Sequence, residues 1–340
     1  MTDYSSPLLA LPGAVPADVP DGGIALHYGD PFREQRQLAE QAGWVDRSNR
    51  GVLAVPGTDR LSWLHSLTSQ HLTELGDGSA TETLILSPHG HVEQHAQVSE
   101  LAGTTWLDTE PGTIAELAGY LESMRFWSAV EPADVSSDWA LLSLVGPATG
   151  AVLGKLGLTG ELPPQGVAAL GAGWVRRMSW PDTDAADLLV PAAELAEWPE
   201  RLAAAGATPA GSWAFEALRV QARRPRLGFE TDHRTIPHEV GWIGIAVHLD
   251  KGCYRGQETV ARVHNLGRPP RRLVLLHLDG DSEKLPAPGA PISVAERPVG
   301  FVGTAVRHYE LGPIALAVIK RTVPDDAELL VEGTVAAIDR

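Results

Sequence analysis

Cysteine is almost absent from this chain, which has a single one, Cys253, among 340 residues. One cysteine excludes a disulfide within the chain and any zinc site that draws several thiolates from it. Long apolar runs are also missing, since no window approaches the roughly 18 residues of a membrane-spanning helix. No basic residue precedes the short apolar stretch at the N-terminus, so a secretory signal is not expected. We therefore expect a cytoplasmic protein.

Positive charge is scarce, because 27 Lys and Arg face 43 Asp and Glu, for a formal net charge of −16. This balance disfavours nucleic acid or an anionic membrane as the partner of the whole surface. Residues 219–272, the basic segment, are the exception, with eleven Lys and Arg against five Asp and Glu. The basic segment predicts either a local anion site, such as one for a carboxylate-bearing cofactor, or arginines that pair with nearby acids.

Apolar periodicity predicts an α+β protein of two or three domains. Asp30 followed by Pro31 predicts the capped start of a first helix over residues 31–43. Further helices are predicted over residues 58–71, 113–124, 147–157, 191–205 and 212–222. Strands are predicted over residues 52–55, 83–86, 91–100 and 141–145. Residues 160–173 are rich in Pro, Gly and Ala and predict a surface connection, whereas 273–338 hold five or six short strands that predict a small β-barrel.

The lone cysteine lies between two glycines in residues 250–258 (DKGCYRGQE), with Lys251 and Arg255 each two residues away. Neighbouring cations lower the pKa of a thiol and make it a better nucleophile or metal ligand. The alternative is a buried cysteine that packs as a small apolar residue, the commonest fate of a free cysteine. The charged surroundings favour a functional thiol at Cys253, assisted by the two cations.

A metal site is a rival interpretation of the stretch around residue 92. If this stretch is extended, four potential ligands share one face: His89, His91, Glu93 and His95. Imidazoles with a carboxylate suit zinc or iron. Same-face neighbours on a strand lie about 6–7 Å apart, so one strand seldom supplies more than two ligands to an ion. We therefore prefer a solvated or channel-lining strand and expect no metal.

Several motifs together resemble one known family. Residues 251–258 (KGCYRGQE) match the K-G-C-Y-x-G-Q-E signature of the YgfZ family, the folate-binding relatives of the glycine-cleavage-system T-protein, an aminomethyltransferase. Other stretches resemble the L-R-x-E-A-G-x-P, R-x-G and T-I-P-x-E elements and the opening shared by T-protein and YgfZ; they are residues 218–222, 224–228, 235–239 and 45–65. The resemblance covers most of the chain.

The resemblance implies an α+β, T-protein-like body around a central folate channel, with a small C-terminal β-barrel. It implies an irregular arm at 1–23, the aminomethyltransferase-like body at 24–267 with an internal boundary near 125–145, and the barrel at 268–340. The bound cofactor would be tetrahydrofolate or a derivative. The folate contacts that it implies are Gln221, Arg219, Arg226, Glu239, Tyr254, Gln94 and His95.

The chain departs from T-protein at two places that matter for chemistry. T-protein enzymes carry an acidic pair that assists transfer of the one-carbon unit, and Gln94 and His95 stand there in this sequence. A neutral amide cannot act as a general base, and an imidazole is a different acid–base partner. The glutamate that contacts the pterin in T-protein is Gln221 here, which keeps a carbonyl acceptor without the charge. These departures argue against aminomethyltransferase activity.

The resemblance implies an accessory protein that binds tetrahydrofolate and supports assembly or repair of iron–sulfur clusters, with Cys253 as the functional thiol. Its partners would be iron–sulfur client proteins, including tRNA-modifying radical-SAM enzymes, or cluster-assembly factors. One thiolate cannot hold a cluster alone, because clusters need about four ligands. The alternatives are a folate-dependent aminomethyl or methyl transferase, and a module that stores or senses folate with the cysteine incidental.

Overall fold

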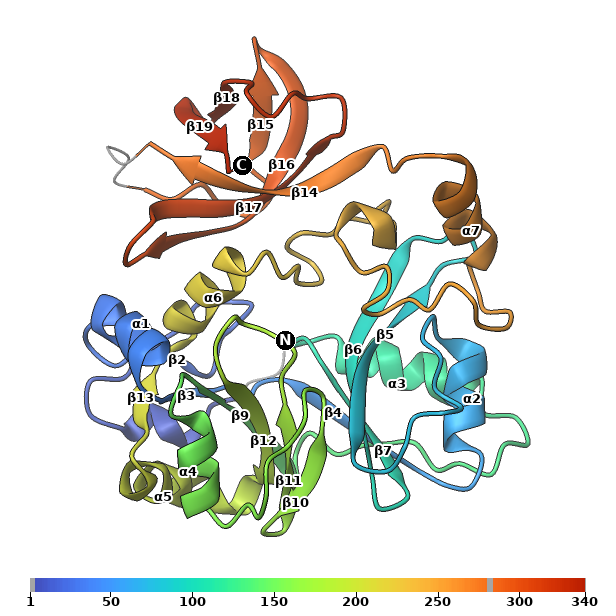
Figure 1. The fold of residues 1–340 in the computed structure, drawn as a ribbon, viewed down its shortest axis with the longest axis vertical. Coiled ribbons are helices and arrows are strands. Elements are labelled where there is room, and N and C mark those ends of the chain that lie inside the picture. Colours follow the sequence, from blue (N-terminus) through green and yellow to red (C-terminus); the bar gives the residue numbers. More distant parts are fainter. Residues whose placement is uncertain (1–3, 280–283, 340) are drawn as a thin grey trace. The chain divides into compact units, whose positions relative to one another are not determined.

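The computed structural model describes residues 4–279 and 284–339. The chain divides into two compact units. Unit 1 comprises residues 1–65, 72–82 and 96–215, and unit 2 comprises residues 66–71, 83–95 and 216–340. Helices are interspersed with mainly antiparallel sheets, so the predicted α+β class is confirmed (Figure 1).

Unit 1 holds a six-stranded sheet in the order β10-β11-β12-β9-β3-β13. Only β13 runs parallel to its neighbour, β3; the other pairs are antiparallel. Alternate strand residues such as Leu142 and Leu188 pack against helices α4 and α5 in one apolar cluster. The bounds are β3 Gly43–Asp46, β9 Trp139–Val145, β10 Val167–Leu170, β11 Gly173–Arg177, β12 Ala185–Pro191, β13 Thr208–Ala210, α4 Thr149–Lys155 and α5 Trp198–Ala205.

A second sheet has five strands in the order β5-β6-β7-β4-β8. Residues 83–86 of β5 and 92–95 of β6 belong to unit 2, and the rest of the sheet belongs to unit 1. Helix α3 buries Leu117 and Leu121. The bounds are β4 Gly51–Pro56, β5 Ser79–Leu86, β6 Val92–Leu101, β7 Thr104–Thr109, β8 Ala133–Asp134 and α3 Ile114–Ser123.

The N-terminal part of unit 1 adds shorter elements. Asp30 caps helix α1 by accepting a hydrogen bond from the backbone of Arg33, with Pro at the start of the helix, as the sequence predicts. Residues 4–23 contain one turn of 3₁₀-helix and one short strand. The bounds are η1 Pro7–Ala10, β1 Val15–Pro16, β2 Ala25–His27, α1 Pro31–Glu40 and α2 Arg60–Leu67.

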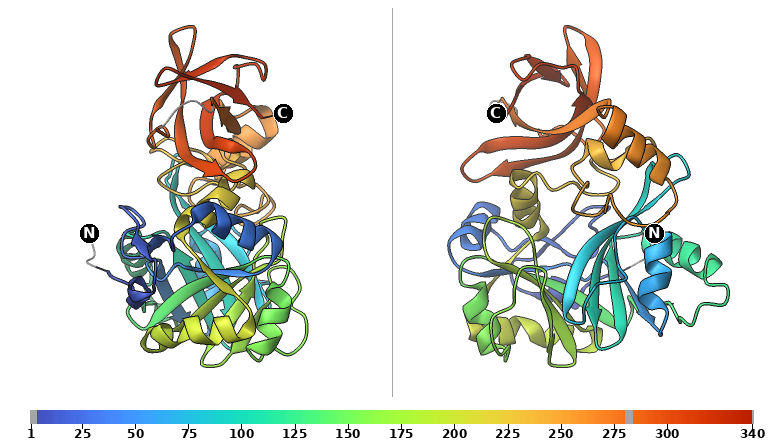
Figure 2. Two further views of the ribbon diagram at one scale, coloured as in Figure 1. Left: turned by 90° about the vertical axis from the view of Figure 1, so that its left-hand side faces the viewer. Right: turned by 45° about the vertical axis from the view of Figure 1, so that its right-hand side comes forward.

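Unit 2 contains the C-terminal barrel, closed in the order β14-β17-β16-β15-β18-β19, which confirms the predicted barrel. Alternate residues, among them Leu276, Ile292 and Ile319, fill its interior. Figure 2 shows its strands, orange to red, from two further sides. The bounds are β14 Arg271–Leu278, β15 Pro291–Val294, β16 Arg297–His308, β17 Gly312–Lys320, β18 Leu329–Val331 and β19 Thr334–Ile338. Helices α6 Ser212–Gln221 and α7 Gln257–Leu266 and the 3₁₀ turn η3 Pro237–Glu239 precede the barrel.

The structure corrects three predicted elements. The surface connection at 160–173 contains strand β10, because a short Val-Ala-Ala-Leu run gains its stability by pairing with β11. The single helix at 191–205 is a 3₁₀ turn, η2 Ala192–Glu197, followed by α5. The helix predicted to end near residue 71 ends at Leu67. Long-range pairing and packing override local propensity at each of these places.

Candidate functional site

The loop that presents Cys253 is anchored in unit 2 by two buried residues, Lys251 on one side and Tyr254 on the other. Lys251 is 5% exposed, and its ammonium group donates to the backbone carbonyls of Thr68 and Gln70, the latter at 3.1 Å. Burial lowers the pKa of Lys251 to about 8. Lys251 therefore fastens the loop to residues 68–70.

Tyr254 is the second anchor of the loop. Its ring is buried in an apolar cluster with Trp242, 5.0 Å from the Lys251 ammonium nitrogen. Burial raises the pKa of Tyr254 to about 12, and its hydroxyl has no hydrogen-bond partner within the part of the chain that the structure describes. Cys253, between these buried neighbours, is exposed. The thiol is thus presented to solvent from a fixed loop.

A hairpin turn supports the loop from a second direction. Gly256 has a φ of +84°, and a Cβ there would lie 2.6 Å from the Ser87 carbonyl oxygen and 2.9 Å from the Gly90 Cα. One residue earlier, Arg255 pairs with Glu93 at 3.0 Å. Both partners of that ion pair are more than a third exposed, so the pair adds little stability. The close backbone contact, which only glycine permits, sets the position of the loop against the turn.

Replacing Gly256 by alanine is expected to lower the free energy of unfolding by about 3 kcal/mol, because a positive φ and a backbone clash act together. Gly228 is the matched control: its φ is +85° and no atom lies within 4 Å of its ideal Cβ position. Alanine there is expected to cost about 1 kcal/mol, the strain of the positive φ alone. Urea unfolding of both variants measures the difference, and equal losses would contradict the close contact.

The two residues predicted to stand in place of the T-protein acidic pair are both buried. Gln94 is 6% and His95 7% exposed. The His95 ring stacks on the Trp242 indole, with 4.9 Å between ring centroids and 17° between planes. An imidazole is thus present where the sequence predicted it, held against an aromatic surface of the same unit.

The four side chains that a metal site would need do not lie together. His89 lies in the turn before β6, Glu93 is exposed and pairs with Arg255, and His95 is buried on Trp242. Over residues 4–279 and 284–339, no three or more His, Cys, Asp or Glu side chains are grouped so that they could hold a metal ion. The strand begins at Val92, so the alternation assumed for residues 89–95 holds for only part of that stretch.

Gln221 is exposed at the end of helix α6, and His308 fixes the orientation of its side chain. The His308 ring nitrogen Nδ1 accepts hydrogen bonds from the backbone of Glu310 and Leu311. Nε2 therefore carries the proton and donates to the Gln221 side-chain oxygen at 3.2 Å. Burial lowers the pKa of His308, which keeps the ring neutral in this arrangement. The Gln221 amide nitrogen, the donor of this side chain, is thereby oriented as well.

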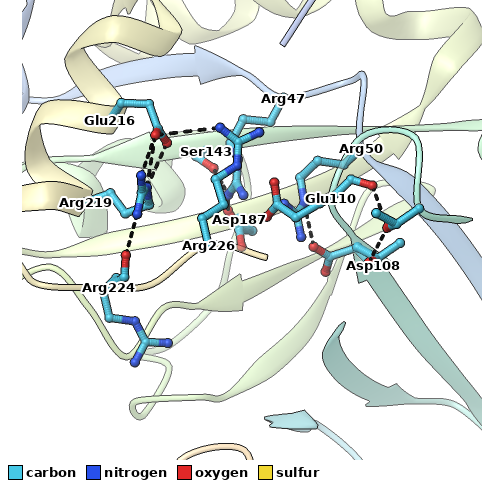
Figure 3. Close-up of polar contacts among 12 residues, drawn as sticks. Arg47, Arg50, Asp108, Glu110, Ser143, Asp187, Glu216, Arg219, Arg224 and Arg226 are labelled. Carbon is cyan, nitrogen blue, oxygen red and sulfur yellow. Dashed lines mark hydrogen bonds and ion pairs between the residues drawn. The ribbon is translucent and has the colours of Figure 1, made fainter. Parts of the chain in front are cut away.

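Three other residues predicted to contact folate have structural partners. Arg219 is buried and bonds to Glu216 (Figure 3). It also bonds to Glu230 and Thr304. Arg226 is buried 3.6 Å from Glu216. Glu239 accepts from Arg271 and from the backbone of Ile236. These contacts give all three side chains a role within unit 2, and folate contact by any of them stays a prediction.

The arginines of the basic segment mostly pair with acids. At least seven of its eleven cations form ion pairs with carboxylates of unit 2: Arg219, Arg223, Arg226, Arg234, Arg255, Arg271 and Arg272. Arg271, for example, bonds both Asp232 and Glu239. Of the two interpretations of the basic segment, the structure favours paired arginines.

Sequence reasoning missed a buried ion network in unit 1. Arg176 donates to Asp108 at 2.7 Å and to Asp187 at 2.6 Å. Arg50 also donates to Asp108, at 2.9 Å (Figure 3). The side chains of these four residues are at most 4% exposed. Arg50 lies within the opening motif at residues 45–65, which was the only signal in the sequence. Arg176 joins β11 of one sheet to β7 of the other.

Comparisons with known proteins agree on a family. The sequence model of the GCVT N-terminal domain matches residues 30–251. The aminomethyltransferase of Symbiobacterium thermophilum is 28% identical, covering 93% of this chain and 89% of that protein. A chloroplastic protein of Arabidopsis thaliana, named as a transferase, is 30% identical over 75% of this chain. The aligned part spans 60% of that protein's length.

A solved structure matches the fold over nearly the whole chain. The glycine cleavage system aminomethyltransferase T of Bartonella henselae covers 97% of this chain and 93% of its own, with a TM-score of 0.86 at 20% identity. At this identity the likeness establishes the fold: an aminomethyltransferase-like α+β protein with a C-terminal six-stranded barrel. In the described part of the chain, no helix is both long and apolar enough to traverse a membrane.

Proposed function

Because this chain belongs to the GCVT N-terminal domain family, we propose that it binds a reduced folate and transfers a one-carbon group. The observation that carries the proposal is the extent of the similarity. Relatives named aminomethyltransferase align with 93–94% of this chain, a span that includes the loop of Cys253, His95 and Gln221. This proposal corresponds to the transferase alternative of the sequence analysis.

Two predicted folate contacts of unit 2 carry groups that could hydrogen-bond a pterin. The Tyr254 hydroxyl is a buried polar atom without a protein partner among the described residues, so an unmade hydrogen bond is available there. Gln221 offers an exposed amide in a fixed orientation. We assign the pterin to the exposed Gln221 amide, and folate contact by the buried Tyr254 hydroxyl stays a prediction. Bound tetrahydrofolate would supply the nitrogen atoms that accept the one-carbon group.

His95 is the group that we assign to proton transfer. Its imidazole takes the place of the missing acid, and stacking on Trp242 fixes the plane of the ring. A positioned imidazole can accept a proton and return it near neutral pH, which a buried amide such as Gln94 cannot. The proposed chemistry therefore relies on a histidine where T-protein uses a carboxylate.

Titration of the purified protein with tetrahydrofolate without oxygen tests the binding. Replacing Gln221 by glutamate is expected to tighten binding about tenfold, because a carboxylate forms stronger hydrogen bonds to an amino-pyrimidine than an amide does. Alanine at the same position is expected to weaken it about fivefold. Cys253→Ala is the control and should bind like the parent chain, since the thiol is exposed. No saturable binding at millimolar folate would contradict the proposal.

A second candidate follows from the exposure of Cys253. A thiol held at the surface by two buried neighbours is suited to reach another protein. This favours the accessory role implied by the YgfZ resemblance, in which the thiol serves iron–sulfur client proteins. In cells that carry Cys253→Ala, such a role predicts lower activity of cluster-dependent enzymes with folate binding intact. Unchanged enzyme activity in those cells would contradict it.

A further inference from the structure

Two large aromatic side chains of unit 1 stand almost fully in solvent. Trp127 is 97% and Phe126 73% exposed, on the loop between helix α3 and strand β8. Their ring centroids are 6.3 Å apart, so the two rings form one apolar surface. Burying such a side chain would contribute about 1.5–3 kcal/mol to folding, and this loop forgoes that contribution at two adjacent residues.

The loop around the aromatic pair is held rigidly. The backbone of Ala129 donates to the Asp59 carboxylate at 2.8 Å, and the backbone of Glu131 donates to the Pro56 carbonyl at 3.1 Å. On the other side of the pair, the Trp63 indole donates to the Met124 carbonyl at 3.0 Å. Phe126 itself has a φ of +44°, a conformation that needs such support. A rigid loop loses little entropy when it binds.

The surroundings of the pair indicate the chemistry of what binds it. A depression of about 450 Å³ adjoins the loop, lined by residues 56–58, 128–131 and Arg125. Residues 114–138 contain five acids and one base, Arg125, which pairs with Glu122. The acids of the segment that carries the two rings, with Glu131 in the lining of the depression, are complementary to a basic surface. A second copy of this chain, with a formal charge of −16, or an anionic membrane would be repelled.

We propose that residues 124–131, the aromatic loop, are a docking site for a partner protein whose surface offers an apolar pocket surrounded by Lys and Arg. Exposed Trp and Phe on a fixed loop are the residue types that anchor protein interfaces. The apolar pocket of the partner receives the two rings. The Lys and Arg around that pocket face the acids of residues 114–138. None of these residues is a predicted folate contact or part of the Cys253 loop.

A photo-crosslinking amino acid at position 127 of the full chain, expressed in its own host, tests the proposal. The cross-linked protein is identified by mass spectrometry, purified and titrated with the parent chain and with Trp127→Ser. The variant folds because its side chain is exposed, which circular dichroism checks. We expect binding at least about 30-fold weaker for Trp127→Ser, and weaker binding of the parent chain as salt rises. Phe32→Ser, which changes an exposed aromatic of helix α1, is the control and should bind like the parent.

Four results would overturn the proposal. The first is equal affinity of Trp127→Ser and the parent chain, and the second is a cross-linked surface that is acidic. The third is dimerisation of the parent chain in sedimentation experiments that the variant loses, which would make a second copy the occupant. The fourth is the absence of any cross-link to another protein. That result includes the case in which the parent chain instead binds phosphatidylglycerol vesicles through Trp127.

Discussion

Replacing Arg176 by methionine is expected to lower the free energy of unfolding of unit 1 by about 3–5 kcal/mol. The Arg176 guanidinium is buried and holds two buried carboxylates, Asp108 and Asp187, one on each side. Methionine fills much of the volume but leaves both carboxylates without their shared cation. Arg50 stays bonded to Asp108 at 2.9 Å, but the network is left one cation short, and uncompensated buried charge costs far more than the lost pair contributes.

The matched control for this experiment is Arg201→Met. Arg201 also joins two carboxylates, Glu194 and Glu197, but it lies on the surface with its side chain 42% exposed. The change in the free energy of unfolding for Arg201→Met should fall within the error of a urea unfolding measurement. A loss for Arg176→Met as small as that of the control would contradict the structural role of the network.

Lowering the pH should diminish the difference in the free energy of unfolding between the parent chain and Arg176→Met. Burial alone would raise the pKa of Asp108, but Arg176 and Arg50 hold it below its usual range. A carboxyl with a depressed pKa contributes stability that is present above its unfolded pKa, near 4, and lost as pH falls through the folded value. The deficit of the variant is therefore largest at neutral pH and shrinks below about pH 4.

The sequence predicted those parts of the fold that depend on local pattern. The short strands of the barrel alternate apolar residues inward, and Gly and Pro separate them, so a small barrel of five or six strands was expected. Helix α1 was expected from the Asp30 cap and the proline that follows it. The buried ion network was not expected, because Arg176 and Asp108 are 68 residues apart in the sequence. No local pattern encodes a pairing of that range.

The candidate site shows the same division. The KGCYRGQE motif singled out Cys253 and its neighbours, and the structure presents that thiol on the surface. The direction of the Lys251 side chain could not be read from the motif, since its partners lie 183 and 181 residues away. His308, 87 residues from Gln221, likewise gave no sign that it orients the amide. Motifs identify residue types, and tertiary contacts decide what each side chain is free to do.

Replacing His95 by glutamine is expected to lower kcat for one-carbon transfer to tetrahydrofolate by 10²–10⁴-fold, roughly the contribution of a general acid–base group, with little change in folate affinity. Glutamine keeps a polar side chain on Trp242 but cannot carry the proton. The assay supplies an aminomethyl-lipoyl protein or an N-methylated amine as donor and measures the substituted folate that forms. Loss of the stacked ring should cost only about 1 kcal/mol of stability, which thermal unfolding checks.

Cys253→Ala, measured in the same assay, separates the two candidate functions. If the protein is a one-carbon transferase that uses His95, the exposed thiol takes no part and the alanine variant turns over like the parent chain. If the thiol serves iron–sulfur clients, the pattern reverses in cells: Cys253→Ala loses cluster-dependent activities while His95→Gln keeps them. A parent chain that binds folate but transfers no one-carbon group would remove the transferase proposal. The thiol of Cys253 would then be the group to which the function belongs.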